Sequence, residues 1–167
     1  MIDVRVDDLA FWDGEAIARP VNAELGATTS LLRRLEQAAG PKLAEQLRTQ
    51  EPLAVGSAVV TGAGALAAEL LIHAVIQSAA EPVSEATVRR ATMSALHRAD
   101  AWEIARLAFA PFGLGPGNLE AEESARVMVA EIRRHLAAAR HPREVTIVVE
   151  NDEERDAFAF EVSRGHG

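Results

Sequence analysis

Residues 51–76 read EPLAVGSAVVTGAGALAAELLIHAVI and contain two short apolar segments on either side of a glycine-containing turn. The segments 57–61 (SAVVT) and 70–76 (LLIHAVI) are short and contain β-branched residues, so both predict buried β-strands. His73 lies within the second segment. A lone histidine in an apolar strand is typical of a hydrogen-bonded core residue, because a metal ligand would need partners at ligand spacing and the other histidines do not provide them.

Strand and helix patterns alternate on both sides of this stretch. The remaining strands are expected at 2–6, 16–22, 104–109 and 145–149, and helices at 31–39, 42–50, 82–102, 119–135 and 152–162. Thr28–Ser30 and Ser84 precede helices as N-cap candidates, and Gly40 is a candidate helix stop. Pro20 favours a strand that is irregular or lies at the end of the sheet, because proline cannot donate a backbone hydrogen bond.

This alternation predicts an α/β fold, a three-layer α/β/α sandwich around a mixed, mostly parallel central sheet. No long linker divides the chain, so we expect a single domain over residues 1–167. Any antiparallel pairing is expected in the N-terminal pair of strands. Ligands of such sheets bind beyond the carboxyl ends of the strands, so loops that follow strands are the candidate functional positions.

Composition and charge exclude several classes of function. The 167 residues include no cysteine, which excludes disulfides, thiolate nucleophiles and cysteine-ligated metals. Seventeen basic and 25 acidic residues give a net charge of −8, so we expect neither a nucleic-acid partner nor a membrane partner. We expect a cytoplasmic protein, and the high alanine content with arginine favoured over lysine suggests a bacterial source. An oligomer is compatible with the sequence.

The glycine-rich segment 113–118 (GLGPGN) lies between a predicted strand and a predicted helix. Its three glycines permit positive φ angles and a close approach of backbone to a ligand. Its N–H groups and the following helix terminus would suit a phosphate or pyrophosphate. The segment is neither a Walker A loop nor a G-x-G-x-x-G motif, and Pro116 lacks an N–H group. A tight strand-to-helix turn is the alternative interpretation.

Two polar residues lie at the ends of predicted strands: Asp8 just after the first and Asn22 as the last residue of the second. Asp8 accepts a hydrogen bond from a ligand amine or serves as a turn or N-cap residue, and both readings are open. Asn22 either meets a ligand hydroxyl or fixes its own loop. The sequence contains no G-x-S-x-G elbow and no recognisable Ser/His/Asp arrangement, so we predict no catalytic residue, no metal and no cofactor.

Taken in order, these pieces resemble a macrodomain, the α/β module that binds ADP-ribose and includes Appr-1″-p processing proteins. The resemblance runs from Ile2 to about Phe160. Residues 51–76 carry the most specific match, to the family's Pro-Leu-x-x-Gly-x-Ala…Thr…Leu…Ile-His-Ala-Val. Asp7-Asp8-Leu9 takes the place of a Gly-Asp-Ile turn, residues 21–25 that of Val-Asn-Ala-Ala-Asn, and residues 113–118 that of Gly-Thr-Gly-x-Gly-Gly.

The resemblance implies a role for each matched position. The adenine amino group would donate to Asp8 beside the backbone of Leu9, the loop 113–118 would wrap the pyrophosphate, and Asn22 with the loop 28–30 would lie near the distal ribose. The implied ligand-binding residues are Asp8, Leu9, Asn22, Thr28, Ser30, Gly113, Leu114, Gly115, Gly117 and Asn118.

The sequence departs from the family mostly at the distal-ribose end. The family's second asparagine is Leu25 here, its triple glycine is replaced by residues 28–30, and the aspartate of its hydrolase branch is Leu32. Leu114 replaces the threonine of the pyrophosphate loop, and Glu150 replaces the aromatic residue that stacks on adenine. Each lost partner of a buried ligand hydroxyl costs about 1–3 kcal/mol, so the distal-ribose site is degenerate.

This pattern predicts a non-catalytic module that binds ADP-ribose or a related adenine nucleotide derivative. Two alternatives are open. One is a hydrolase of ADP-ribosyl or O-acyl-ADP-ribose substrates, and the other is a structural or partner-binding domain that has lost its ligand pocket.

Overall fold

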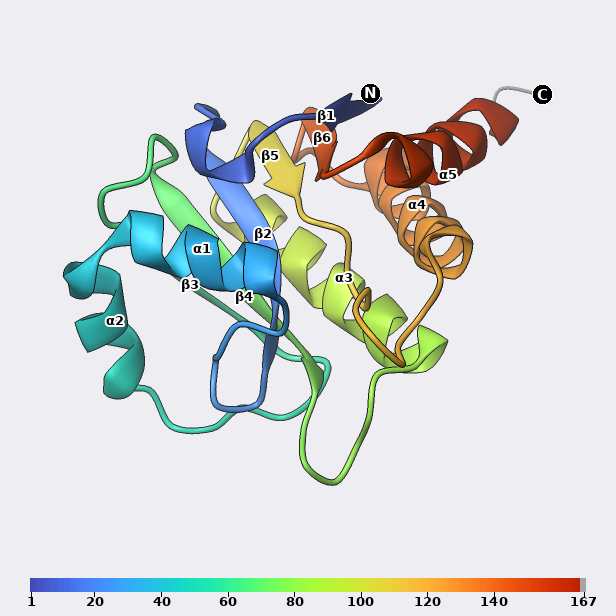
Figure 1. Cartoon of the computed structure of the whole chain (residues 1–167). Helices are drawn as coiled ribbons and strands as arrows, with labels where there is room; N and C mark the ends of the chain where they lie inside the picture. The colour runs from blue at the N-terminus through green and yellow to red at the C-terminus, as the bar shows by residue number, and fades with distance from the viewer. Residues whose placement is uncertain (166–167) are drawn as a thin grey trace.

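The computed structural model describes residues 1–165, in which strands and helices alternate as expected (Figure 1). The strands are β1 (Ile2–Val6), β2 (Ala16–Asn22), β3 (Ala58–Gly62), β4 (Leu70–Gln77), β5 (Arg106–Phe109) and β6 (Glu144–Val149). The helices are α1 (Ser30–Ala39), α2 (Pro41–Arg48), α3 (Glu85–Ala101), α4 (Ala121–Ala138) and α5 (Asp152–Arg164), with a short 3₁₀ helix η1 (Leu9–Phe11). Only η1 was not expected, and His166 lies outside the described residues.

Local side-chain chemistry sets the helix boundaries. The Thr29 hydroxyl accepts a hydrogen bond from the Leu32 N–H at 3.3 Å and caps α1. Ser84 caps α3 in a reciprocal capping box with Thr87. Gly40 ends α1 with a φ of 87°, a conformation that favours glycine, and Pro41 then begins α2. These positions confirm the caps and the stop expected from the sequence.

The six-stranded sheet has the order β1-β6-β5-β2-β4-β3, and every neighbouring pair is parallel except β3 with β4. The mostly parallel sheet is therefore confirmed, but the expected place of the antiparallel pair is wrong. β1 lies at the edge beside β6 and does not pair with β2. The antiparallel pair is β3–β4, because residues 63–69 are too few for the crossover that a parallel pair requires.

Pro20 lies in β2, which is a central strand, so the end position that Pro20 suggested is wrong, whereas the alternative of an irregular strand agrees with the register shift at Val21/Asn22. The carbonyl of Ala18 faces β5 and accepts from the Ala110 N–H at 3.0 Å. Pro20, two residues further on, faces the same side, but the pairing of β2 with β5 ends at Ala18 and Phe109. No ladder donor is needed at Pro20, so the central strand tolerates it.

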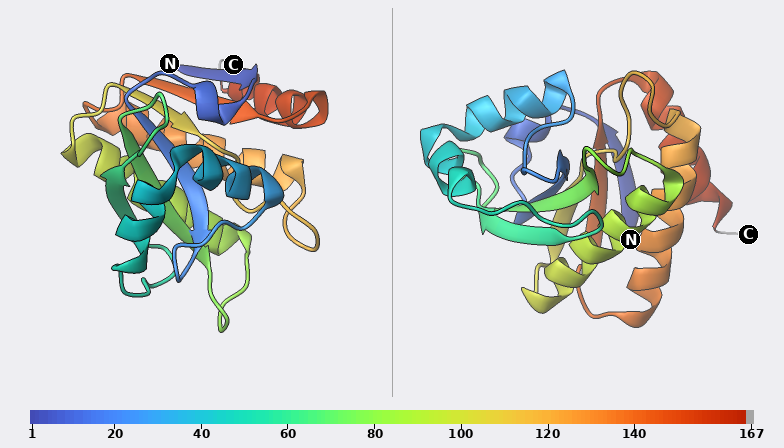
Figure 2. Two further views of the ribbon diagram at one scale, coloured as in Figure 1. Left: turned by 60° about the vertical axis from the view of Figure 1, so that its left-hand side comes forward. Right: turned by 90° about the horizontal axis from the view of Figure 1, so that it is seen from below.

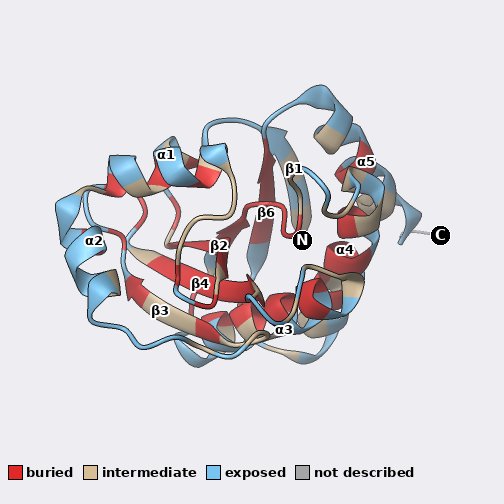
Figure 3. Ribbon diagram, turned by 60° about the horizontal axis from the view of Figure 1, so that its bottom comes forward, coloured by how far each residue is buried: buried red, intermediate tan, exposed pale blue. Residues whose placement is uncertain are grey.

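Helices cover both faces of the sheet, as the view from below shows (Figure 2). Alternate residues of the strands join different cores: Ala16 and Ala18 pack with α3, α4 and α5, whereas Ile17 packs with η1, α1 and α2. The strands between these layers are largely buried, while the outer helix faces are exposed (Figure 3). The three-layer sandwich is confirmed. Within residues 1–165, no helix is both long enough and apolar enough to cross a bilayer.

Candidate functional site

A cleft of about 440 Å³ lies beyond the carboxyl ends of β2, β5 and β6, the edge where loops were expected to carry function. One wall is the loop before α1 together with the first turn of α1. The opposite wall is the loop after β5 and the start of α5. The cleft-lining residues are Pro20, Thr28, Thr29, Ser30, Leu31, Leu32, Arg33, Arg34, Ala110, Pro111, Leu114, Gly115, Pro116, Glu150 and Glu154.

A second cavity of about 410 Å³ adjoins the cleft, since Leu31, Arg34 and Glu150 line both. It is bounded by the end of β1, by η1 and by α1, and its lining includes Asp8, Leu9 and the exposed ring of Phe11. Asp8 Oδ1 caps η1 by accepting from the Ala10 N–H at 3.0 Å. The N-cap reading of Asp8 is therefore confirmed, while its second oxygen accepts no hydrogen bond within residues 1–165.

The glycine-rich loop after β5 presents backbone donors near the cleft. Gly113, Gly115 and Gly117 all have positive φ angles, as the sequence suggested. The loop closes on itself, because the Asn118 N–H donates to the Gly115 carbonyl and the Leu119 N–H to the Gly113 carbonyl. In the described part of the chain, the N–H groups of Leu114 and Gly115 donate to no protein acceptor, so they are free to bind an anion.

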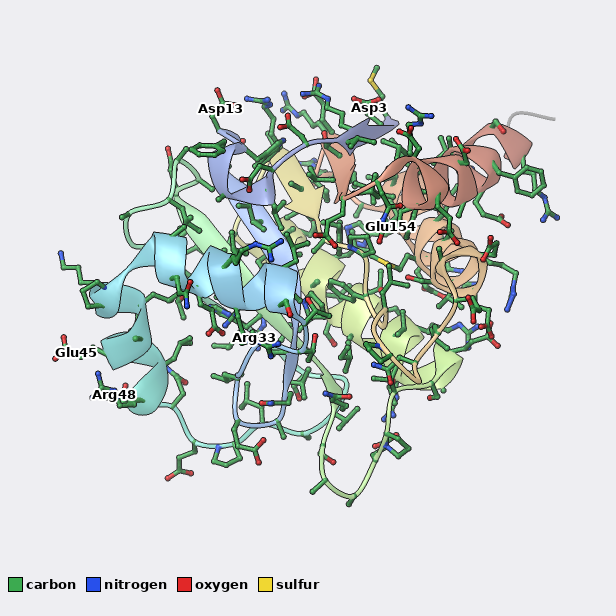
Figure 4. The ribbon with its side chains drawn as sticks, in the orientation of Figure 1. Asp3, Asp13, Arg33, Glu45, Arg48 and Glu154 are labelled. Atoms are coloured by element: carbon green, nitrogen blue, oxygen red, sulfur yellow. The ribbon has the colours of Figure 1, made fainter. Side chains whose placement is uncertain are left out.

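Both signs of charge line the cleft, as the sticks of Arg33 on α1 and Glu154 on α5 illustrate (Figure 4). Arg34 and Glu150 form an exposed ion pair of 3.3 Å where the two cavities meet. Glu154 accepts a hydrogen bond from the Glu150 N–H at 3.1 Å. Burial raises the pKa of the Glu154 carboxyl above its ordinary value, although the hydrogen bond from the Glu150 N–H opposes that change.

The structure brings together only part of the residue set predicted from the sequence. Thr28, Ser30, Leu114 and Gly115 line the cleft, and Asp8 and Leu9 line the adjoining cavity. The other predicted residues, Asn22, Gly113, Gly117 and Asn118, line neither of these two cavities.

Asn22 and Gly113 have structural roles. Asn22 Oδ1 accepts from the N–H groups of Glu24 and Gly26, so its side chain fixes its own loop. Gly113 is buried against Val88, and a Cβ there would lie 2.7 Å from Val88 Cγ2. Leu25 is also buried, with a φ of 67°.

Sequence reasoning missed the cleft-lining side chains Arg33, Arg34 and Glu154. It also missed Arg19, a fully buried charge beneath the loop that lines the cleft. Arg19 Nε–H donates to His73 Nδ1 at 2.8 Å, which confirms His73 as a hydrogen-bonded core histidine. The available signal was a single charged residue within the apolar segment 16–22.

No group of three or more His, Asp or Glu side chains within residues 1–165 is arranged to hold a metal ion. The donors in the cleft are backbone N–H groups, hydroxyls and guanidinium groups, which suit an anionic ligand. The fold and the cleft thus define an α/β/α domain with a site at the carboxyl ends of its parallel strands.

Comparisons with known sequences identify the family. The family model described as Macro domain matches residues 18–128. The chain belongs to the Macro domain family, as the sequence resemblance predicted. An uncharacterised protein of Aquifex aeolicus is 35% identical over 148 residues, which cover 85% of each chain. An uncharacterised protein of Mycobacterium tuberculosis is 29% identical over 98% of this chain, but the chain spans only 45% of the length of that relative.

Solved structures show the same fold at low sequence identity. The macrodomain of Oceanobacillus iheyensis with ADP superposes with a TM-score of 0.87 at 17% identity, covering 98% of this chain and 90% of that one. A mutant of the same macrodomain with ADPR gives 0.86 at 18% identity, covering 98% and 92%. The macrodomain of Trypanosoma brucei in complex with ADP gives 0.86 at 17% identity, covering 96% and 68%.

Proposed function

We propose that this chain is a non-catalytic module that binds ADP-ribose or a related adenine nucleotide across the two adjoining cavities. The continuity of these cavities through Leu31, Arg34 and Glu150 is the observation that carries the proposal. A carboxylate lies at one end and free backbone donors lie at the other. This order of an acceptor followed by donors suits a ligand with an amine-bearing base at one end and phosphates further along.

Each end of the site has a defined task in this proposal. The free Oδ2 of Asp8 accepts from the adenine amino group while Oδ1 continues to cap η1. The N–H groups of Leu114 and Gly115 donate to the pyrophosphate, and Arg33 and Arg34 supply positive charge from α1. The similar macrodomains solved with ADP and with ADPR support this class of ligand.

We propose that the module is a single domain and that it is located in the bacterial cytoplasm. Within its family we place it beside the Appr-1″-p processing proteins. The absence of cysteine supports a reducing compartment, and the high alanine content with arginine favoured over lysine supports a bacterial source. Its net charge of −8 makes neither nucleic acid nor a membrane an expected partner.

A hydrolase of ADP-ribose derivatives is the second candidate, because the Glu154 carboxyl lines the cleft with a raised pKa. Incubation with mono-ADP-ribosylated protein and with O-acetyl-ADP-ribose tests it. We expect no product. Product that disappears in Glu154→Gln would establish the hydrolase and refute the non-catalytic assignment.

Isothermal titration calorimetry with ADP-ribose, ADP and AMP tests the proposed binding. We expect micromolar binding of ADP-ribose that weakens about tenfold to a hundredfold in Asp8→Asn. Asparagine keeps an oxygen for the η1 cap but turns an amide N–H₂ donor toward the base, so the change isolates ligand recognition. Asp13→Asn, an exposed carboxylate outside both cavities, is the matched control. No heat with any of the three nucleotides would overturn the proposal.

A further inference from the structure

The buried side chain of Arg19 contacts three different parts of the fold. Its Nε–H donates to His73 Nδ1 in β4 at 2.8 Å, and its Nη2–H donates to the Leu25 carbonyl in the loop after β2 at 3.1 Å. Its Nη1–H donates to Glu36 Oε1 on α1 in an ion pair. Arg19 therefore joins the sheet to both the loop and the helix that form one wall of the cleft.

The hydrogen bonds of Arg19 continue through His73 to Thr61, and together they form a network that ends at β3. Because His73 Nδ1 accepts from Arg19, the neutral ring carries its proton on Nε2, which donates to Thr61 Oγ1 at 2.7 Å. The Thr61 hydroxyl then donates to the Gly62 carbonyl at 2.9 Å. The hydrogen bonds run in one direction from Arg19 to the edge strand β3, away from the cleft.

Stability alone does not account for a charge at this position. Arg19 is fully buried, and burial lowers the pKa of its guanidinium while Glu36 opposes that change. Well-packed apolar residues often replace a buried ion pair without loss of stability. In some proteins such a pair instead selects one conformation, and here the partners come from separate segments, a fully buried Arg19 in β2 and a partly exposed Glu36 in α1.

The loop before α1 has a conformation that needs such support. Leu25 has a φ of 67°, a left-handed conformation that is unfavourable for a residue with a Cβ atom. The Leu25 carbonyl is held by Arg19, and the Asn22 side chain holds the turn around it. Residues 28–34, which line the cleft, begin three positions after Leu25, so the conformation at Leu25 sets where they lie.

We infer that Arg19 is a positioning residue, which fixes the loop 23–29 and α1 in the geometry that the ligand requires. This inference rests on the proposed nucleotide site and identifies what holds one wall of it in place. Arg19 does not line the cleft and contacts no ligand in this account. By holding the loop 23–29 and α1 in place before the ligand binds, Arg19 lowers the conformational entropy that is lost on binding.

Three variants separate positioning from simple stability. Arg19→Met removes all three contacts, and Glu36→Ala removes only the contact to α1 at a partly exposed side chain. Thr61→Val is the matched control, since it breaks the network on the far side of His73 and leaves the contacts of Arg19 with Leu25 and Glu36. Glu36→Ala keeps the test valid if Arg19→Met does not fold.

We expect the Kd for ADP-ribose to rise about tenfold or more in Arg19→Met and Glu36→Ala, and less than about twofold in Thr61→Val. Equal Kd values in all three variants, or weakening that follows their loss of thermal stability, would overturn the inference.

Amide hydrogen exchange without ligand gives an independent readout. We expect faster exchange in residues 25–33 of Arg19→Met and Glu36→Ala, and unchanged exchange there in Thr61→Val. If wild type binds no nucleotide, the proposed function fails, and hydrogen exchange still decides the positioning role. Unchanged protection of residues 25–33 in Glu36→Ala would contradict it.

Discussion

At the scale of single residues, His73 shows how a buried side chain acquires a fixed protonation state. Burial and the adjacent Arg19 charge lower the pKa of His73 well below its ordinary value. The ring is neutral in the folded chain, where it accepts from Arg19 and donates to Thr61. The unfolded chain leaves the same ring in water with an ordinary pKa of about 6.5.

This difference in protonation predicts a pH dependence of stability. Because the folded pKa is lowered, the unfolded state binds more protons below about pH 6.5, and folding is progressively destabilised as the pH falls. We expect the free energy of unfolding to decrease by about 1 kcal/mol per pH unit below that point from this residue alone. Urea titrations at several pH values measure it. His73→Asn should lower overall stability yet flatten the slope between pH 6.5 and 5, and an unchanged slope would refute the assignment.

The environment of His73 was predictable from the sequence, but its partner was not. An apolar strand around a lone histidine indicates burial, whatever the topology. Arg19 lies 54 positions earlier, and the two side chains meet only because β2 and β4 are neighbours in register. Likewise, Arg33, Arg34 and Glu154 belong to the cleft because of how α1 and α5 are placed on the sheet, which no local pattern specifies.

At the scale of elements, two glycines in the loop between β5 and α4 are required for different reasons, one for backbone conformation and packing and the other for backbone conformation alone. Gly113 has a φ of 85° and no space for a side chain, because Val88 Cγ2 would lie 2.7 Å from an added Cβ. Gly117 has a φ of 79°, but an added Cβ would meet no atom within 4 Å. The first position is constrained by both backbone and packing, and the second by backbone alone.

Alanine substitutions should measure this difference. We expect Gly113→Ala to reduce the free energy of unfolding by about 2–4 kcal/mol, the sum of backbone strain and overpacking against α3. Gly117→Ala should cost about 1 kcal/mol, since it adds backbone strain only. Urea denaturation of both variants checks the prediction. Equal losses would contradict the packing role assigned to Gly113.

Element positions were predictable to within a few residues, because caps and glycine stops are local signals. The order of the strands was not. Pro20 suggested an end or irregular strand. The central strand β2 tolerates this proline because its pairing with β5 ends at Phe109, and the residues around Pro20 do not reveal where β5 ends. The antiparallel pairing of β3 with β4 follows from the short connection 63–69, whose length can be read from the sequence.

At the scale of the whole molecule, distant parts of the chain build one cleft. Its lining draws on β2, the start of α1, the loop after β5 and the segment after β6. These parts come together only in the folded chain, so a ligand that spans them binds the folded state and not the unfolded state. Binding must therefore stabilise the fold as a whole.

The stabilisation has a predictable size. At a free ADP-ribose concentration of one hundred times the Kd, the free energy of unfolding should rise by about 3 kcal/mol. For a chain of this length that corresponds to an increase in melting temperature of about 5–10 °C. Differential scanning calorimetry with and without ADP-ribose measures it, and Asp8→Asn should show a smaller shift at the same concentration. An identical shift in both proteins would place the ligand elsewhere.

A crystal structure of the chain with ADP-ribose is the most direct test of the proposed site. We predict an ordered ligand whose adenine amino group lies within hydrogen-bond distance of Asp8 and whose pyrophosphate lies against the N–H groups of Leu114 and Gly115. An empty cleft at saturating ADP-ribose, or a ligand bound away from Asp8 and Gly115, would contradict the account.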